Sequence, residues 1–192
     1  MFLEESLWIK GQIHAIRIKT GAKVLDVGSA SLEYRTKMQP YIEQNIFKLL
    51  QKLQCKIFHL DCKKQEGVDI ECDINNLDKL SEQYDLIICA NLLEHIKNRD
   101  RFAKDIVALM NNEGHLIVTV PYNLDYHPDP IDTLYRPSPK ELEELFDSLV
   151  VIDSELVDTP SALHHYNRIK AIVDLLLMKR YKVSCGIFKK VL

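Results

Sequence analysis

The sequence lacks both a long apolar run and a positively charged start. No uninterrupted apolar stretch approaches the roughly 20 residues that span a bilayer, so no transmembrane segment is expected. The first residues, MFLEESLWIK, contain two acids where a secretory signal would carry positive charge. We therefore expect a cytoplasmic protein.

Cysteine pairs are also missing. The five cysteines are an odd number and show no CxxC spacing, which indicates neither a disulfide framework nor a zinc knuckle, and we expect reduced, mostly buried thiols. His59, Cys62 and Cys72 come nearest to a metal cluster. Alternating strand positions point to opposite faces, however, and a fourth ligand is not evident, so we expect no metal.

Basic residues are not in excess. The chain has 25 Lys and Arg against 28 Asp and Glu, and the resulting net charge of -3 gives no general attraction to phosphate backbones or anionic membranes. Nucleic acid is therefore not an expected partner. The 192 residues, 46% of them apolar, suffice for one globular domain with a sizeable core, which we expect to cover residues 1–192.

Apolar runs of strand length alternate with segments of helical periodicity. A helix is expected within residues 1–20, and further helices over Pro40–Leu53 and Arg99–Met110. The expected strands are Lys23–Val27, Lys56–Leu60, Val68–Cys72, Asp85–Ala90 and His115–Val120. Continuous apolar runs indicate strands that are covered on both faces, so the alternation predicts an open α/β fold with a mostly parallel sheet.

The C-terminal part continues this pattern around a long loop. Residues 121–139 are rich in Pro, His, Asp, Tyr and Arg, and the capping box Ser138–Glu141 then starts a helix. Leu149–Leu156 and Tyr181–Phe188 are expected to be strands that pair as neighbours. An amphipathic helix over residues 160–180 is inserted between them, and it either packs in the core, covers the site, contacts a membrane surface or forms a homodimer contact.

Ligands of open α/β sheets bind beyond the carboxyl ends of the strands, which directs attention to the residues that follow each strand. In VLDVGSASLE, Gly28 allows a tight turn, and the N–H groups of Ser29 and Ala30 are candidates to receive a carboxylate or phosphate. Asp61 follows the second strand, where an acid can bind a ribose diol; the alternative is a surface aspartate that caps a turn. Asp73 follows the third strand and can accept a hydrogen bond from an exocyclic amine.

Together, the motifs LDVGSA, the acid at Asp61, GVDIECD, YDLIICANLLEHI and GHLIVTVPY resemble those of S-adenosylmethionine-dependent methyltransferases with a Rossmann-like sheet, over about residues 22–146. YDLIICANLLEHI is similar to the small-molecule type found in ubiquinone and menaquinone biosynthesis. With this resemblance we expect an open, mostly parallel seven-stranded sheet that has helices on both faces and an antiparallel last strand. An enzyme that binds a nicotinamide dinucleotide typically has GxGxxG at the first turn, and GSASLE does not match this motif.

The resemblance also implies a cofactor site. The implied contacts are Asp26, Gly28, Ser29 and Ala30 for the methionine part, Asp61 for the ribose, Asp73 and Ile74 for the adenine, Ala90 and Asn91 near the sulfonium, and His95 at the cofactor edge. Two features depart from the family. Ala30 stands where the glycine-rich turn commonly has a further glycine, and the span from Asp61 to Asp73 is too short for the customary second helix, while the span from Asp26 to Asp61 indicates an elongated first helix.

The 121–139 loop leaves the fifth strand on the cofactor side and should border the acceptor. His127 is the candidate general base, because an imidazole can accept a hydroxyl proton at neutral pH. Candidate acceptor contacts are Tyr122, Asp129, Asp132 and Arg136. The alternative is a structural loop network that includes His127 and Asp129 and in which Arg136 pairs with Asp132.

The expected function is methyl transfer from S-adenosylmethionine to a small molecule or a sugar or lipid intermediate. Enzymes of this family that methylate base amines commonly carry an Asn/Asp-Pro-Pro-aromatic motif after the fourth strand, where this chain has residues 90–93, ANLL. Oxygen is therefore the favoured acceptor atom. The alternative is a catalytically inactive cofactor-binding or scaffold protein that retains the fold.

Overall fold

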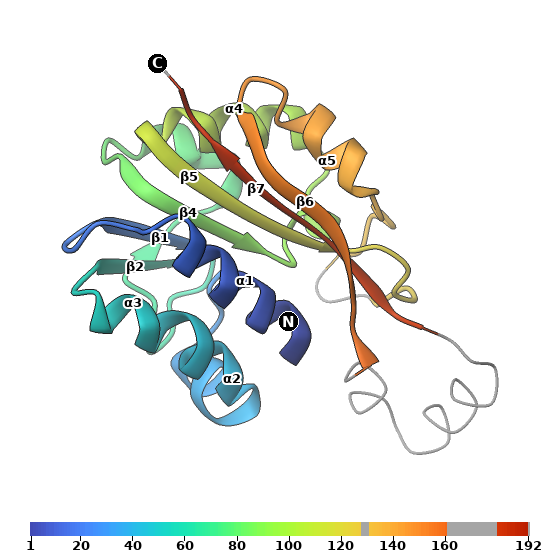
Figure 1. Cartoon of the computed structure of the whole chain (residues 1–192), viewed down its shortest axis with the longest axis horizontal. Helices are drawn as coiled ribbons and strands as arrows, with labels where there is room; N and C mark the ends of the chain where they lie inside the picture. The colour runs from blue at the N-terminus through green and yellow to red at the C-terminus, as the bar shows by residue number, and fades with distance from the viewer. Residues whose placement is uncertain (128–130, 161–179, 192) are drawn as a thin grey trace.

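A seven-stranded sheet forms the centre of the computed structural model, which describes residues 1–127, 131–160 and 180–191. The strand order is β3-β2-β1-β4-β5-β7-β6, and β7 runs antiparallel to both of its neighbours while the other pairs are parallel (Figure 1). The strands are β1 (Lys23–Val27), β2 (Lys56–Asp61), β3 (Ile70–Glu71), β4 (Tyr84–Ala90), β5 (Met110–Pro121), β6 (Val150–Asp158) and β7 (Lys182–Lys189). The predicted fold class is confirmed.

Helices cover both faces of the sheet (Figure 1). They are α1 (Leu3–Ala15), η1 (Tyr34–Met38), α2 (Pro40–Ile42), η2 (Glu43–Phe47), α3 (Lys48–Lys52), η3 (Ile74–Lys79), η4 (Leu93–His95), α4 (Arg99–Ala108) and α5 (Pro139–Leu145). On one face, Ile9 of α1 and Leu50 of α3 are buried with Val24 of β1. On the other face, Phe102 of α4 and Leu142 of α5 share a core with strand residues. Burial on both faces is the physical reason for the continuous apolar runs in the strands.

The capping box that the sequence predicts is present at the start of α5. The Ser138 hydroxyl accepts a hydrogen bond from the Glu141 N–H over 3.3 Å, and the Glu141 carboxylate accepts one from the Ser138 N–H over 2.7 Å. These two bonds satisfy backbone donors that the helix itself leaves unpaired. The helix start is therefore encoded locally.

The predicted elongated first helix is divided rather than continuous. Gln39 adopts φ -129° and ψ 66° immediately before Pro40, and π-helical segments lie on both sides of this bend. A proline disfavours the α conformation of the residue before it, which explains the interruption at Gln39. Residues 62–69 form turns and bends instead of a helix, in agreement with the short span noted in the sequence, and β3 is limited to two residues.

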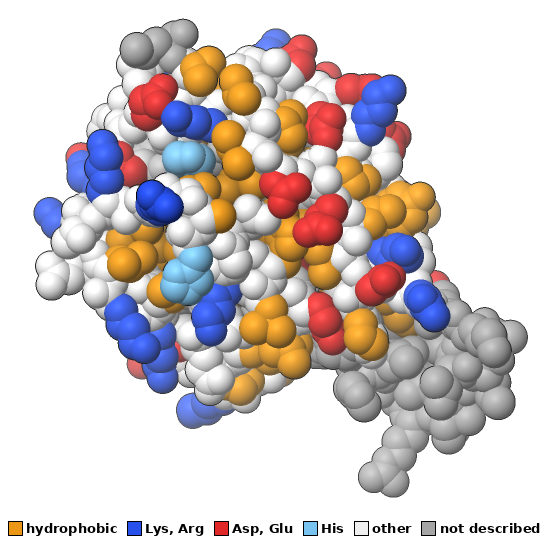
Figure 2. Space-filling view, viewed as in Figure 1, with side chains coloured by type: hydrophobic (Ala, Val, Ile, Leu, Met, Phe, Trp, Pro, Cys, Tyr) orange, Lys and Arg blue, Asp and Glu red, His pale blue; other side chains and the backbone are white. Residues whose placement is uncertain are grey.

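The face of the molecule seen in Figure 2 carries acidic and basic side chains interspersed with hydrophobic ones. In the part of the chain that the structure describes, none of the helices is both long and apolar enough to cross a membrane. The predicted helix at 160–180, with its predicted homodimer contact, falls almost wholly on residues 161–179 and lies outside the described residues.

Candidate functional site

Four predicted site residues follow parallel strands and lie at the same edge of the sheet. β2 and β4 both pair with β1 in parallel, and β3 pairs with β2 in the same way. Gly28, Asn91 and Asp73 therefore come after the carboxyl ends of β1, β4 and β3, and Asp61 ends β2. The chain proceeds from β1 to β2 on one side and reaches β4 on the other, so this edge contains the point where strand order reverses.

The turn after β1 has two residues with positive φ. Gly28 has φ +77°, and a side chain there would also approach Cδ1 of Leu92 to 3.2 Å, so the position requires glycine. Ala30 has φ +55°, a left-handed conformation that costs an L-residue about 1–2 kcal/mol. Ala30 therefore adopts a backbone conformation that glycine would adopt at a lower energetic cost.

The backbone N–H groups of this turn bind within the protein. Ser29 N–H donates to Leu60 O over 3.0 Å, and Ala30 N–H donates to Oδ2 of Asp61 over 3.0 Å. The prediction that both groups are exposed for a carboxylate or phosphate is therefore wrong, because the turn is closed against the end of β2. The contact fixes the Asp61 carboxylate beside the turn, and its oxygens retain lone pairs for further donors.

Arg35 of η1 is a buried cation that the sequence did not indicate. Its side chain is fully enclosed, with 2% of the residue exposed. Nη1 donates to Ser29 O over 3.0 Å and to Ala30 O over 2.7 Å, and Nη2 donates to Gly67 O over 2.9 Å. Arg35 thus joins the β1 turn to the segment between β2 and β3. A helical arginine is usually exposed, so only the tertiary contacts identify this role.

The remaining acids at this edge have partners of their own. Oδ2 of Asp26 lies 2.9 Å from Nδ1 of His59, its register partner on β2. Asp73 is exposed and caps η3, where its Oδ1 accepts from the backbone and side-chain nitrogens of Asn75 over 2.8 Å each. Ile74 packs against the adjacent core. Asp61 is thus in direct contact with the β1 turn, whereas the hydrogen bonds of Asp73 stay within its own segment.

Glu5 connects α1 to the ends of β4 and β5. It is fully buried, with 0% exposed, and its Oε1 accepts from Nδ2 of Asn91 over 2.8 Å and from the Thr119 hydroxyl. Its Oε2 accepts from the Phe2 N–H over 2.9 Å. Asn91, which has φ +50° just after Ala90 at the end of β4, is therefore directed at Glu5. In the sequence, Glu5 served only as an argument against a secretory signal, and this contact was not predicted.

Glu94 and His95 form the turn beyond β4 together with the 121–139 loop. The Thr133 N–H donates to Glu94 O over 2.8 Å, and Nδ1 of His95 lies 2.5 Å from Ile131 O. Glu94 is 1% exposed, and among the described residues its Oε2 has no hydrogen-bond partner. Burial raises the pKa of Glu94 to about 8, and the nearby charge of Glu5 adds to this effect.

The predicted pairing of Arg136 with Asp132 is present in the loop. Nη2 of Arg136 donates to Oδ2 of Asp132 over 2.6 Å, and the His127 N–H donates to the same oxygen over 3.1 Å. Burial acts to raise the pKa of Asp132, but the hydrogen bonds from Arg136, His127 and Leu134 outweigh it and hold the pKa below its usual range. Tyr122 is exposed, and Asp129 lies outside the described residues.

The loop also brings two histidines together. The rings of His95 and His127 have centroids 5.6 Å apart and stand nearly perpendicular, at 84°. Both come from segments that follow the carboxyl ends of strands, β4 for His95 and β5 for His127. The predicted base is therefore next to the turn that carries Glu94.

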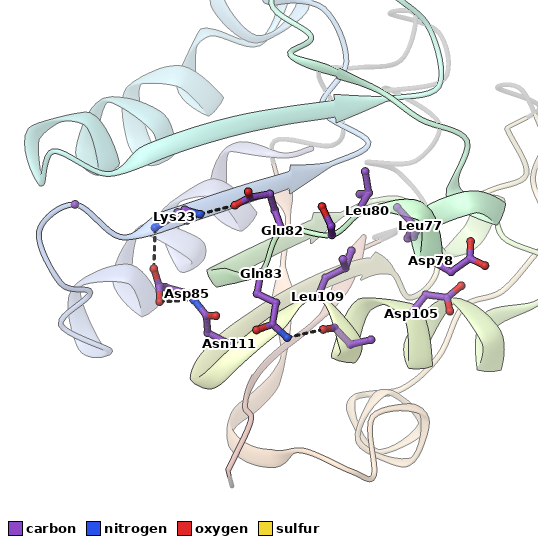
Figure 3. A pocket seen from close by; sticks show the side chains of 13 residues that line it. Lys23, Leu77, Asp78, Leu80, Glu82, Gln83, Asp85, Asp105, Leu109 and Asn111 are labelled. Atoms are coloured by element: carbon purple, nitrogen blue, oxygen red, sulfur yellow. Dashed lines mark hydrogen bonds and ion pairs between the residues drawn. The ribbon is translucent and has the colours of Figure 1, made fainter.

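A separate cavity of about 780 Å³ lies at the opposite edge of the sheet (Figure 3). Its lining includes Lys23 at the start of β1, Gln83 just before β4 and Asn111 near the start of β5. The Lys23 N–H and Nδ2 of Asn111 both donate to the Asp85 carboxylate, over 2.8 and 2.9 Å. We place the candidate site at the carboxyl edge instead, because ligands of open α/β sheets bind there.

The chain matches a model of a known protein family over most of its length. A family model described as a methyltransferase domain matches residues 9–150. No curated protein matches the sequence.

Solved structures share the fold at low sequence identity. A coclaurine N-methyltransferase bound to N-methylheliamine and SAH is 17% identical with a TM-score of 0.65, over 97% of this chain and 72% of that one. A SAM-dependent methyltransferase from Archaeoglobus fulgidus is 14% identical with a TM-score of 0.56, over 96% and 94%. The [4+2]-cyclase SpnF is 14% identical with a TM-score of 0.57, over 96% and 80%. At these identities the structural likeness establishes the fold alone.

Proposed function

Because this chain belongs to the methyltransferase domain family, we propose that it transfers a methyl group from S-adenosylmethionine to an oxygen atom of a small molecule or of a sugar or lipid intermediate. When bound, this cofactor supplies a methyl group activated by a sulfonium. The observation that supports the proposal most directly is the contact between Asp61 and the β1 turn at the carboxyl edge. An acid in that position can bind the two hydroxyls of a ribose.

The groups at this edge fit the chemistry of the cofactor. It presents a diol and two positive centres, a sulfonium and an ammonium, and the edge offers the carboxylates of Asp26 and Asp61. We assign the cofactor contacts to Asp26, Gly28, Ser29, Ala30, Asp61, Asp73, Ile74, Ala90, Asn91 and His95. The N–H groups of Ser29 and Ala30 already donate to Leu60 and Asp61, so other donors would have to bind the carboxylate of the methionine part.

The acceptor is proposed to lie between this edge and the 121–139 loop. Methyl transfer depends mainly on alignment, which can contribute about 7–11 kcal/mol, and on removal of a proton when the acceptor is a hydroxyl. His127 would accept that proton, while the buried Asp132 holds its backbone and the ring lies beside His95. Tyr122 is exposed at the start of the loop and would contact the acceptor, whereas Asp132 and Arg136 bind each other and shape the loop.

We also propose a cytoplasmic location. All five cysteines are free thiols, as expected for a protein in a reducing compartment. Only Cys89 and Cys185 are fully buried, so the expectation of mostly buried thiols is wrong: Cys55 and Cys72 are half-buried and Cys62 is exposed. Burial raises the pKa of Cys89 and Cys185 far above the usual range for a thiol, which keeps both uncharged.

Calorimetry with S-adenosylmethionine and S-adenosylhomocysteine tests the proposed site. We expect a dissociation constant near micromolar, equivalent to about -8 kcal/mol. Asp61→Ala should weaken binding by roughly 10- to 100-fold, because a charge-assisted hydrogen bond contributes about 1.5–3 kcal/mol. Asp78→Ala, which removes an acid at the opposite cavity, should leave the affinity unchanged.

Circular dichroism of each variant checks that the fold is intact. If Asp78→Ala abolishes binding and Asp61→Ala does not, the cofactor binds at the opposite cavity and our proposal is wrong. Binding without methyl transfer to any member of a panel of phenols, sugars and lipid alcohols would favour the inactive cofactor-binding protein.

A further inference from the structure

Three potential metal ligands gather where the turn after β4 meets the 121–139 loop. Glu94, His95 and His127 each offer one ligand atom, and in the part of the chain that the structure describes these atoms lie within 4.8 Å of one another. Two imidazole nitrogens and one carboxylate oxygen are a donor set that Zn²⁺ and related divalent transition metals accept. The sequence-based expectation of no metal considered only His59, Cys62 and Cys72. It did not include this group, because His127 is distant from Glu94 and His95 along the chain.

The surroundings of His95 leave one ring nitrogen available. Its Nδ1 lies 2.5 Å from Ile131 O, and a carbonyl oxygen can only accept, so Nδ1 carries the hydrogen. In the neutral ring the lone pair is then on Nε2, which lies 3.8 Å from Oε1 of Glu94. Two electron-rich atoms thus face each other, an arrangement that a cation between them would stabilise.

His127 is held in a similar way. Its Nδ1 lies 3.3 Å from Asp125 O and 3.3 Å from Oδ2 of Asp132. A carbonyl or carboxylate that accepts from one nitrogen of an imidazole is the usual partner of a histidine whose other nitrogen binds a metal. Arg136 in turn fixes the Asp132 carboxylate, so the orientation of the imidazole is supported from behind.

Glu94 provides an independent observation. Its side chain is almost fully buried, and Oε2 lacks a hydrogen-bond partner among the described residues. A buried polar atom without a partner costs about 1–3 kcal/mol, so a structure that retains one requires an explanation. A bound cation beside the carboxylate would provide it.

We propose that Glu94, His95 and His127 bind a divalent transition metal ion of the Zn²⁺ class. Ligand atoms around tetrahedral Zn²⁺ are about 3.4 Å apart, given bonds of about 2.0–2.2 Å, so the three side chains must close by about 1 Å on binding. His127 can make this adjustment, since its side chain is 35% exposed and belongs to a loop. Three protein ligands leave a coordination position for water or an acceptor oxygen.

The metal site also refines the role of His127, and this step rests on the proposed function. A nitrogen that coordinates a metal cannot accept a proton, so the general-base role applies to the metal-free protein. In the metal-bound protein, the ion would lower the pKa of a coordinated acceptor hydroxyl, and the proton would leave to solvent.

Equilibrium dialysis of the tag-free protein against Zn²⁺ tests the proposal. We expect one tightly bound equivalent in the wild-type protein. Removal of a group that only orients a metal ligand weakens metal binding by about 10- to 100-fold. His127→Ala and His95→Gln remove the ligands themselves, so each should weaken Zn²⁺ binding by more than this. His14→Ala, at an exposed histidine of α1, and Cys62→Ser, at the exposed cysteine, should bind like wild type.

Two results would overturn the proposal. One is Zn²⁺ binding that persists in both histidine variants; the other is binding that is lost in Cys62→Ser. If a histidine variant does not fold, Co²⁺ bound to the wild-type protein decides the question. Visible absorption bands of Co²⁺ with nitrogen and oxygen ligands support the site, whereas an intense near-ultraviolet thiolate band contradicts it.

Calorimetry separates this inference from the proposed function. His127→Ala should retain its affinity for S-adenosylhomocysteine, because His127 is not among the assigned cofactor contacts. Cofactor binding without Zn²⁺ binding in the wild-type protein would refute the metal site alone. Zn²⁺ binding without cofactor binding would refute the proposed function and leave the metal site in place.

Discussion

Replacing Glu5 with alanine should strongly destabilise the fold. The carboxylate is fully buried and accepts hydrogen bonds from Asn91, Thr119 and the Phe2 N–H. The Asn91 amide and the Thr119 hydroxyl would each lose a partner, at about 1–3 kcal/mol. Loss of the helix cap at Phe2 adds about 1 kcal/mol. We therefore expect the free energy of unfolding to fall by about 3–7 kcal/mol.

Urea unfolding followed by circular dichroism measures this change. Glu4→Ala is the matched control, since Glu4 lies in the same first turn of α1 and meets the same helix dipole. That effect amounts to about 0.3–1 kcal/mol, so the control should lose no more than about 1 kcal/mol. Equal losses in the two variants would show that the buried contacts of Glu5 do not contribute, and our reasoning would be wrong.

A conservative replacement makes the test sharper. Glu5→Gln keeps one side-chain oxygen, which can still accept from Asn91 and Thr119, but its amide nitrogen cannot accept from the Phe2 N–H. The loss should therefore lie between those of the other two variants, at about 1–2 kcal/mol. A loss as large as that of Glu5→Ala would indicate that the negative charge, and not the geometry, determines the contribution.

Three further predictions concern other positions. Ala30 has φ +55°, a conformation that a β-branched residue adopts only with strain, so Ala30→Val should have a free energy of unfolding about 1–3 kcal/mol lower than that of Ala30→Gly. Urea titrations measure this difference, and equal stability of the two variants would show that the backbone at this position is not strained. Arg35→Lys should lower the free energy of unfolding by about 1.5–3 kcal/mol in the same assay, because an ammonium cannot reach all the carbonyl oxygens that the guanidinium binds. An unchanged unfolding midpoint would show that Arg35 does not stabilise the β1 turn. Burial, followed by the charge of Lys189, lowers the pKa of His115 in the folded protein, so its contribution to stability is fully present above the unfolded pKa of about 6.5 and is lost as pH falls through the folded pKa. The unfolding midpoint of His115→Gln should consequently depend less on pH between about 7 and 5 than that of wild type, and parallel pH profiles would contradict this.

Local patterns were sufficient to predict the architecture. The apolar runs that became β1, β4 and β5 are continuous because each of these strands is largely buried on both faces, and this pattern is visible in any single segment. The start of α5 is equally local, because the cap at Ser138 needs only the next three residues. The bend at Gln39 is also encoded locally by Pro40, the residue at which the predicted helix Pro40–Leu53 begins.

The site was predicted in part. Gly28 and Asp61 were identified from their positions after strands, because parallel strands bring their carboxyl ends to one edge. The sequence could not show that the N–H groups of Ser29 and Ala30 are closed by Leu60 and Asp61, since that depends on how the turn packs against β2.

What the sequence by itself determined is the alternation of strands and helices, and with it the edge of the sheet where the candidate site lies. Only the tertiary structure decided which polar side chains are buried at that edge. Glu5 meets Asn91, Arg35 meets Gly67, and His127 meets His95 across large separations in the chain. The physical reason is that periodicity reports whether a residue faces the core, whereas a hydrogen-bond partner depends on which elements pack together.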